Sequence, residues 1–323
     1  MTEKTNVVLV GASGETGKSV ADGILAFPDK FNLTALARPA SIDKPEYQEL
    51  KNRGVKIAPV DVSSMSDELI SLLSGVDVVI TCLIPTEKDA MKNIAIACQK
   101  AGVGRFIPSF WGPICPPRGV MKLREEKEDI LDLMKSVYLP YTIIDVGWWY
   151  QMSLPSLPSG KIDDRIVFPV TSIKGDGNTE SALIDKRDIG KYVARIITDP
   201  RTLNKSVFIY NEIWTQNGLF DLFEKVSGEQ IPRKYESGED VLATINDAKR
   251  RFAPDDPQLL MAIGLSDYYY SLEIRGDNTP EHAEYLGYLN GKELYPDVQV
   301  ETFEDYMKGV VDGTIERLYI GRR

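Results

Sequence analysis

The chain has 323 residues, 43% of them hydrophobic and 27% charged, which is enough for one large α/β domain or two joined lobes and argues against a disordered chain. Its net charge of −10 disfavours nucleic-acid and anionic-membrane partners, because phosphate contacts require clustered lysine and arginine. No apolar run approaches the roughly 20 residues of a membrane span and no signal-peptide pattern precedes the first apolar segment, so we expect a cytoplasmic protein without membrane contacts.

The first predicted elements are a buried strand over 6–10, the glycine-rich stretch GASGETG over 11–17, and a helix that runs to Phe27. Glycines three residues apart let the backbone turn tightly and approach a ligand, and the helix N-terminus offers N–H groups to phosphate. The stretch therefore predicts a dinucleotide pyrophosphate site. Its expected residues are Gly11, Ser13, Gly14, Glu15, Thr16 and Gly17.

Two other interpretations of this stretch stay open. Residues 12–19, ASGETGKS, nearly match the phosphate loop of nucleotide triphosphatases, in which Lys18 and Ser19 would bind the nucleotide. Asp145, which follows residues 141–144 (YTII), would then be a candidate magnesium ligand. Alternatively, the glycines serve only the backbone of a turn and bind nothing.

A second strand is predicted over 31–37, and Arg38 stands at its end. In dinucleotide-binding folds an acidic residue here holds the ribose of NAD, whereas an arginine accommodates the 2′-phosphate of NADP. Arg38 therefore favours NADPH as the cofactor, and Lys44 could reach the same phosphate. The alternatives are an exposed strand-end charge for Arg38 and a solvated loop lysine for Lys44.

Strands predicted over 55–60, 76–81 and 105–108 alternate with helices over 67–73 and 90–101. This alternation predicts a doubly wound parallel sheet. Ligands of such sheets bind beyond the carboxyl ends of the strands. The glycine stretch, Arg38, residues 81–84 and residues 109–112 should therefore line one crevice, with Ser109 at the cofactor.

The helix predicted over 120–137 has an apolar stripe at residues 120, 123, 130, 131, 134 and 137, and Lys127 falls within this stripe. Its charged neighbours are expected on a solvated face, namely Arg124, Glu125, Glu126, Glu128 and Asp129. A lysine desolvated beside a cofactor that becomes cationic on oxidation would have a lowered pKa and could exchange a proton with a substrate oxygen. The alternative is that its side chain reaches water from the edge of the stripe.

These features, together with the motifs VGRFIPS over 103–109, Lys127-x-x-Ile130, LPYT over 139–142, residues 188–202 and LYPD over 294–297, resemble the NmrA-like, isoflavone-reductase-like family of atypical short-chain dehydrogenases along nearly the whole chain. The resemblance implies a Rossmann-type domain, NADPH, small phenolic or other aromatic substrates, and a catalytic acid or base thirteen residues before the proline of an I-P-Y-T motif. That position is Lys127, before Pro140. The chain departs from the family in lacking the glutamate of P-S-E-F-G and in having Gly147 where an asparagine is usual.

Aromatic residues near the predicted crevice suggest a flat apolar wall for a substrate, although simple packing is the alternative. They are Phe110, Trp111, Trp148, Trp149 and Tyr150. Cys82 and Cys98 are expected in the core, and Cys115 is left unassigned. With His282 as the only histidine, a multi-histidine metal site is excluded, and we expect no metal.

The later chain predicts a hairpin with its turn at Asp176-Gly177 between residues 166–168 and 182–184, a helix over 188–198 and a strand over 206–210. Helices follow over 216–226, 239–252 and 257–274, and Thr302 with Asp305 forms a capping box for the last helix. We expect residues 1–150, joined by 186–212, to form the NAD(P)-binding Rossmann domain. Residues 151–185 and 213–323 would form a smaller, mainly helical substrate-binding lobe.

The sequence thus predicts an NADPH-dependent oxidoreductase that reduces a small, aromatic or conjugated substrate with Lys127 as general acid or base. The alternative is a non-catalytic, NADP(H)-sensing regulator that binds a partner protein, as some NmrA-like proteins do. A homodimer is a further expectation.

Overall fold

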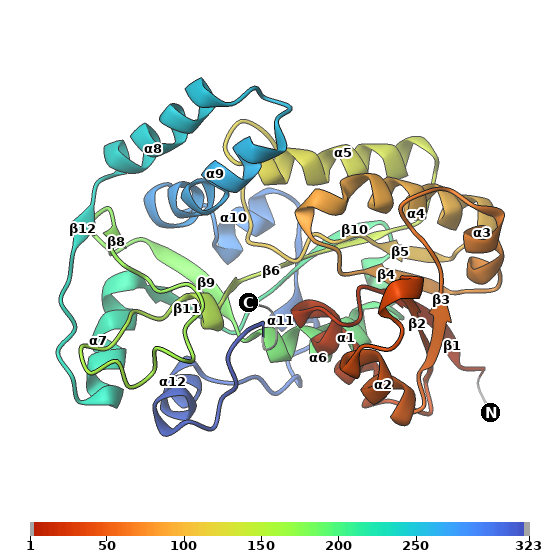
Figure 1. Cartoon of the computed structure of the whole chain (residues 1–323), viewed down its shortest axis with the longest axis horizontal. Coiled ribbons are helices and arrows are strands. Elements are labelled where there is room, and N and C mark those ends of the chain that lie inside the picture. Colours follow the sequence, from red (N-terminus) through yellow and green to blue (C-terminus); the bar gives the residue numbers. More distant parts are fainter. Residues whose placement is uncertain (1–2, 320–323) are drawn as a thin grey trace.

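Parallel β-strands occupy the centre of the computed structural model, which describes residues 3–319 (Figure 1). The first sheet has the order β3-β2-β1-β4-β5, with every neighbouring pair parallel. Its strands are β1 (Thr5–Val10), β2 (Phe31–Ala37), β3 (Lys56–Pro59), β4 (Val78–Thr81) and β5 (Arg105–Ile107). The order reverses beside β1, so the predicted doubly wound sheet is confirmed, with its switch point next to the glycine-rich stretch.

A second group of parallel strands continues this layer. The strands β6 (Thr142–Val146), β10 (Lys205–Ile209) and β13 (Leu289–Asn290) have the order β13-β10-β6. A bridge between Phe106 and Tyr141 joins β5 to the start of β6, and the Phe106 N–H donates to the Pro140 carbonyl at 2.8 Å. Residues 205–209, which the sequence analysis assigned to the Rossmann domain, pair with β6 in this layer. Residues 289–290 belong to this layer as well, although the whole of 213–323 was expected in the smaller lobe.

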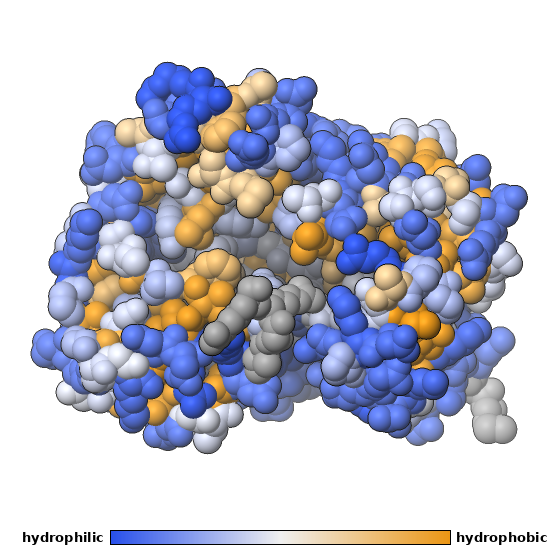
Figure 2. All heavy atoms as spheres, in the orientation of Figure 1, coloured by the Kyte–Doolittle hydropathy of each residue, from blue (hydrophilic) through white to orange (hydrophobic). Residues whose placement is uncertain are grey.

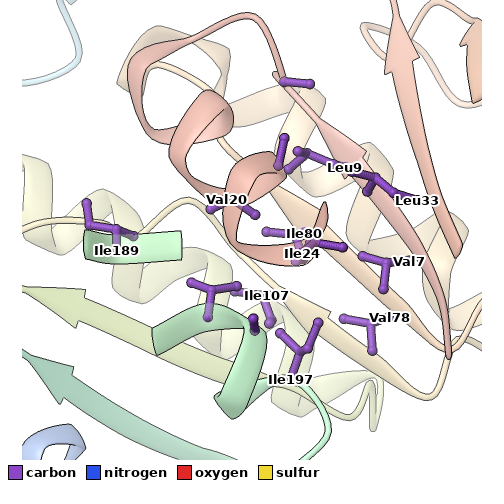
Figure 3. Packing of buried hydrophobic residues seen from close by; sticks show 14 of the residues in the cluster. Val7, Leu9, Val20, Ile24, Leu33, Val78, Ile80, Ile107, Ile189 and Ile197 are labelled. Atoms are coloured by element: carbon purple, nitrogen blue, oxygen red, sulfur yellow. The ribbon is translucent and has the colours of Figure 1, made fainter. Parts of the chain in front are cut away.

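Helices cover both faces of the main sheet. On one face lie α1 (Glu15–Leu25), α2 (Pro45–Asn52) and α6 (Ile189–Ile196), and on the other α3 (Asp67–Leu73), α4 (Lys88–Ala101) and α5 (Lys122–Ser136). Figure 3 shows Val20 and Ile24 of α1 between the sheet and Ile189 of α6. Each buried aliphatic side chain of this kind contributes about 1.5–3 kcal/mol.

Glycine brings α1 and α6 into backbone contact. A Cβ on Gly23 would lie 2.0 Å from the Gly190 carbonyl oxygen, and one on Gly190 would lie 1.8 Å from the Ser19 carbonyl oxygen. The Ser19 hydroxyl donates to the Arg187 carbonyl at 3.2 Å and accepts from the Gly190 N–H at 3.0 Å. Ser19 therefore holds two helices together, which argues against its alternative role at a magnesium nucleotide.

The rest of the chain builds the smaller part, with short sheets ordered β11-β9-β7 and β12-β8. Its strands are β7 (Trp148–Trp149), β8 (Ile173–Lys174), β9 (Glu180–Ile184), β11 (Glu212–Thr215) and β12 (Tyr235–Glu236). Its helices are α7 (Gln216–Ser227), α8 (Gly238–Arg251), α9 (Pro257–Tyr269), α10 (Pro280–Tyr285) and α12 (Phe303–Asp312), whereas α11 (Gly291–Leu294) packs against β10 of the main layer. A π-helical segment, Tyr270–Ile274, extends α9. Among residues 3–319, no helix combines the length and hydrophobicity needed to cross a bilayer.

The hairpin predicted around Asp176-Gly177 is wrong. Gly177 does make a turn with φ of +74°, but residues 166–168 form no strand. Pro169 follows them and has no N–H to donate to a ladder. The strand before the turn is β8 instead, and it pairs in parallel with β12, while β9 pairs with β7 and β11.

The capping box predicted at Thr302 forms only in part. The Thr302 side chain accepts from the Asp305 N–H, as expected. The Asp305 carboxylate, however, accepts from the Thr302 hydroxyl at 2.8 Å and not from its backbone N–H. A complete capping box begins α8, where Ser237 and Asp240 satisfy each other's backbone N–H groups.

Candidate active site

A cavity of about 420 Å³ lies at the carboxyl ends of β1, β4 and β5, between the main sheet and α9. Figure 2 shows the molecule hollowed between its two parts, with hydrophobic residues around the hollow. Its walls come from the start of α1, the loops after β4, β5 and β6, and one face each of α5 and α9. This is the crevice expected for a ligand of a doubly wound sheet.

The glycines of the GASGETG stretch have two different roles. Gly11 has φ of +84°, and a Cβ there would lie 2.3 Å from the Cys82 carbonyl oxygen, while a Cβ on Gly17 would lie 2.1 Å from the Gly11 carbonyl oxygen. The packing of the loop itself requires both. A Cβ on Gly14 would meet its nearest protein atom only at 3.4 Å, an ordinary contact.

Gly14 is also the N-cap of α1 and lines the cavity. Among residues 3–319, no side chain caps this helix terminus, so its N–H groups are available to a ligand. The bare backbone at Gly14 thus offers the close approach that a pyrophosphate needs. Thr16 lines the cavity as well, whereas Gly11, Ser13 and Gly17 do not.

Glu15 lines the cavity with its charge neutralised. Its carboxylate is paired with the Lys186 ammonium and accepts a hydrogen bond from the Tyr319 N–H at 2.8 Å. Burial opposes ionisation of Glu15, but Lys186 and the Tyr319 N–H together hold its pKa below the ordinary value. Because the negative charge is compensated, it does not repel an anion at the start of α1.

Arg38 and Lys44 lie outside the cavity, on the connection between β2 and α2. The Arg38 side chain is 67% exposed, and its nearest carboxylate, that of Glu87, lies 3.9 Å away. Lys44 is also exposed, at the N-cap of α2. Both side chains stand where β2 ends, which is the expected place for a ribose phosphate to be recognised.

Ser109 and Trp111 fix the ends of β4 and β5. The Ser109 hydroxyl donates to the Thr81 hydroxyl at 3.1 Å and accepts from the Leu83 N–H at 2.7 Å. The Trp111 indole N–H donates to the Thr81 carbonyl at 2.7 Å, and Trp111 has an unusual φ of +31°. Both residues line the cavity, so these bonds hold its floor in place.

Lys127 of α5 faces this cavity, as predicted from the helix pattern. Its ammonium donates to the main-chain carbonyl of Phe110 and lies 5.9 Å from the centre of the Phe110 ring. Burial lowers the pKa of Lys127 to about 8, with the Asp145 carboxylate opposing this shift and the Arg124 guanidinium reinforcing it. An amine with such a pKa can both donate and accept a proton near neutral pH.

Two of the charged neighbours of Lys127 lie in the core and not on a solvated face, contrary to expectation. Arg124 and Glu128 are buried, and the Arg124 guanidinium bonds to Asp145 at 2.5 Å, to Glu128 at 2.7 Å and to the Tyr288 hydroxyl at 2.6 Å. Asp145 lies on β6 and is fully buried, so it requires a cation from the helix that covers it. This pairing argues against Asp145 as a magnesium ligand.

Four of the five expected aromatic residues line the cavity, namely Phe110, Trp111, Trp148 and Trp149. Tyr150 does not, and its prediction as a pocket residue is wrong. It is fully buried against Phe303 and Tyr306, with ring centroids 4.7 Å and 5.6 Å away, and its hydroxyl donates to Glu212 at 3.1 Å. The chain turns into a 3₁₀ segment at Tyr150, which directs this side chain away from the cavity.

The structure adds cavity residues that sequence reasoning missed, chiefly Phe168, Leu265, Tyr268 and Tyr319. Met261, Leu265 and Tyr268 share one face of α9, and Met261 and Leu265 are exposed. For Leu265 and Tyr268, the available signal was an apolar face of α9 without a covering partner.

The cysteines are free thiols. Cys98 is in the core as expected, whereas Cys82 lines the cavity. Cys115, left unassigned, is buried among apolar residues, and burial raises the pKa of its thiol to about 12. Cys115 is therefore held as a neutral thiol near neutral pH.

Comparison with known proteins places the whole chain in one group. A sequence profile described as the NmrA-like family matches residues 3–307. The chain is 43% identical over 318 residues to asnovolin J 5′,6′-dehydrogenase of Aspergillus novofumigatus, covering 97% of both chains. It is 29% identical to an isoflavone reductase-like protein of Olea europaea, covering 95% of this chain and 99% of the other.

Solved structures of other proteins have the same fold as this chain. A protein called AtPrR2, solved with NADP+ and (+)-pinoresinol, matches with a TM-score of 0.75 at 26% identity, covering 95% of this chain and 99% of the other. The leucoanthocyanidin reductase of Vitis vinifera in complex with NADPH matches with a TM-score of 0.78 at 23% identity and the same coverage.

Proposed function

Because the chain belongs to the NmrA-like family, we propose that it is an NADPH-dependent oxidoreductase that reduces a small aromatic or conjugated substrate, with Lys127 as the general acid or base. Its relatives include a dehydrogenase, several reductases and a eugenol synthase, all matched over nearly the whole chain. The observation that carries the proposal is the meeting, in one cavity, of a bare Gly14 at a helix N-terminus and a desolvated lysine.

The residues present fit the cofactor. Gly14 and the uncapped start of α1 would hold the pyrophosphate, and Arg38, with Lys44 nearby, would bind the 2′-phosphate that distinguishes NADPH from NADH. When bound, NADPH supplies the hydride. The exposed Arg38 is held only by a distant carboxylate, so little must be broken before it meets a phosphate.

Lys127 would handle the proton. In the direction of reduction, its ammonium donates a proton to the substrate oxygen, and in the direction of oxidation the neutral amine accepts one. The Phe110 carbonyl accepts one of the ammonium hydrogens and so fixes the direction in which the others point. The buried Arg124–Asp145 pair beneath α5 keeps this helix in register with β6.

The cavity favours an aromatic or otherwise flat apolar substrate. The tryptophans Trp111, Trp148 and Trp149 line it, together with further aromatic and aliphatic side chains. Flat aromatic walls of this kind bind planar ligands by stacking and by excluding water. The similarity of the chain to an isoflavone reductase-like protein and to a pinoresinol reductase supports this class of substrate.

The test is NADPH consumption across a panel of aromatic ketones, aldehydes, enones and benzylic ethers, combined with calorimetry of NADPH, NADH and magnesium-ATP. We expect NADPH to bind most tightly, ATP not to bind, and at least one compound of the panel to be reduced. Tight NADPH binding without any turnover, together with a protein partner whose affinity differs between NADP+ and NADPH, would instead favour the non-catalytic regulator.

A further inference from the structure

Lys127 is not alone at the reacting end of the cavity. A Cβ on Gly112 would lie 3.0 Å from the Lys127 Nζ and 3.5 Å from the Tyr268 hydroxyl oxygen. The Phe110 carbonyl oxygen lies 3.3 Å from the same point, so the ammonium, the phenol and the carbonyl that accepts from Lys127 all border the part of the cavity next to Gly112. The two groups come from different parts of the fold, Lys127 from α5 over the main sheet and Tyr268 from α9 in the smaller part.

Tyr268 is held in this position from two sides. Its ring packs against Trp148, with the ring centroids 5.0 Å apart. Its neighbour Asp267, which is buried, accepts a hydrogen bond from the Lys122 N–H at 3.0 Å, and the Lys122 ammonium donates to the Pro254 carbonyl at 2.6 Å. The first turn of α5 is thus bonded to α9 and to the loop before it, and this fixes the separation of Lys127 and Tyr268.

The surroundings keep Tyr268 protonated. Burial raises its pKa well above the ordinary value, and the nearby groups Cys115, Asp145 and Asp267 add to this effect, whereas Arg124 opposes it. Near neutral pH the phenol is therefore a hydrogen-bond donor and not a base. A neutral donor beside a cationic donor suits an oxygen on which negative charge develops.

We propose that Tyr268 donates a second hydrogen bond to the substrate oxygen that receives the proton of Lys127, and that the preferred substrate is therefore a conjugated carbonyl compound. This rests on the proposed reductase function. In an enone, a hydride supplied by bound NADPH would form a C–H bond at the β-carbon. The C=C π electrons would shift to the bond between the α-carbon and the carbonyl carbon, and the C=O π electrons would move to the oxygen. Lys127 protonates this oxygen to give an enol, the enol tautomerises to the saturated ketone, and Lys127 regains its proton from water. Tyr268 stays protonated throughout and stabilises the developing charge.

The kinetic test is Tyr268→Phe, which keeps the ring against Trp148 and removes only the hydroxyl. We expect kcat for the best enone of the panel to fall by about 10²-fold, as for loss of one donor to an oxyanion, with the Kd of NADPH unchanged. The matched control is Tyr269→Phe, the next residue of α9, whose ring lies under Lys174 and lines a separate small cavity. The control should keep wild-type kcat.

A binding test does not depend on turnover. Quenching of the cavity tryptophans would measure the affinity for trans-chalcone and for 1,3-diphenylpropane, which lacks the carbonyl oxygen and the double bond. We expect a preference of about tenfold for chalcone that shrinks in Tyr268→Phe and persists in Tyr269→Phe.

The outcomes separate this inference from the proposed function. If Tyr268→Phe keeps kcat within twofold while Lys127→Ala is inactive, the role of Tyr268 is refuted and the reductase proposal stands. Equal losses in Tyr268→Phe and Tyr269→Phe, or reduction confined to benzylic ethers without a carbonyl, would also overturn the inference. Failure of NADPH to bind would overturn the proposed function itself.

Discussion

The Lys127 ammonium on α5 donates a hydrogen bond to the Phe110 main-chain carbonyl in the loop after β5. This bond crosses from a helix to a loop at the carboxyl end of the sheet, and it places the amine in the cavity. The residues that hold the loop, Ser109 and Trp111, are themselves bonded to Thr81 of β4. The position of the amine is therefore set by the sheet and not by α5 alone.

Replacement of Lys127 by alanine should remove most of the turnover and leave cofactor binding intact. General acid–base catalysis contributes about 10²–10⁴-fold, and kcat should fall by this factor. The measurement is steady-state kinetics with the best substrate of the panel, with the Kd of NADPH as the folding control. Lys135→Ala, at an exposed lysine in the last turn of α5, is the matched control. Unchanged kcat in Lys127→Ala would contradict the role of this residue.

The pH dependence should report the lowered pKa of Lys127, which lies at about 8. Burial is the main cause of the lowered pKa, and the charged and titratable groups that modify it are Asp145, Arg124, Cys115 and Glu128. Reduction needs the ammonium as acid, so its rate should decline as the pH rises through about 8, whereas oxidation needs the neutral amine and should accelerate over the same interval.

Rate profiles in both directions between about pH 6 and pH 10 would check this. In Lys127→Arg the guanidinium remains charged, so the residual reduction should lose its inflection near pH 8. Parallel profiles in the two directions would show that another group controls the proton.

Much of the fold follows from the sequence because its signals are local. The strand–glycine–helix order over 5–25 and the regular alternation that follows it determine a parallel sheet whatever the rest of the chain does. The inward position of Lys127 was also visible, since a helix has one buried face and the residue numbers define it. The misassigned hairpin around Gly177 failed because pairing of β8 with β12 joins residues about 60 positions apart.

The parts of the site that escaped prediction depend on tertiary contacts. Arg124 and Glu128 were placed in solvent because nothing local indicates that Asp145, on another element, needs a buried cation. Tyr268 reaches Lys127 only because α9 folds back over α5, across more than a hundred residues. Tyr150 follows two cavity tryptophans in the sequence, but a change of backbone direction sends it into the core.

Arg38 should determine the choice of coenzyme. Arg38→Glu removes a charge-assisted contact of about 1.5–3 kcal/mol and adds repulsion, so the Kd of NADPH should rise by at least about 10–100-fold while that of NADH changes little. Calorimetry with both coenzymes measures this. Arg250→Glu makes the same change of charge at an exposed site on α8 and should have no effect. An equal rise in the Kd of NADPH and of NADH would show that Arg38 does not bind the 2′-phosphate.

Two alanine substitutions in the glycine-rich stretch should separate ligand approach from packing. A Cβ on Gly17 would lie 2.1 Å from a backbone oxygen, so Gly17→Ala should lower the free energy of unfolding by about 3 kcal/mol. Gly14 has φ of −82°, ψ of 170° and room for a Cβ, so Gly14→Ala should keep the Tm but weaken NADPH binding by about tenfold or more. Thermal unfolding and NADPH titration of both variants are the measurements. A lower Tm with unchanged NADPH affinity in Gly14→Ala would show that the bare backbone there serves folding.

Lys127 should make the fold less stable than it could be. Its pKa is about 8 in the folded protein and 10.5 for a solvated lysine, as in the unfolded chain. Below pH 8, folding therefore transfers a charged ammonium from water into a buried site, which costs free energy. The unfolded chain binds more protons between these values, and the free energy of unfolding therefore rises with pH from about 8 to 10.5. Lys127→Met has a similar volume and no charge, and after loss of the bond to Phe110 it should still stabilise the protein by about 1–2 kcal/mol at pH 7.

Denaturant unfolding at pH 7 and above pH 10 checks this prediction for Lys127→Met, because its stability advantage should shrink as the wild-type lysine becomes neutral in both the folded and the unfolded state. A variant that is less stable at pH 7, or equally stabilised at both pH values, would mean that the lysine is not desolvated in the folded protein.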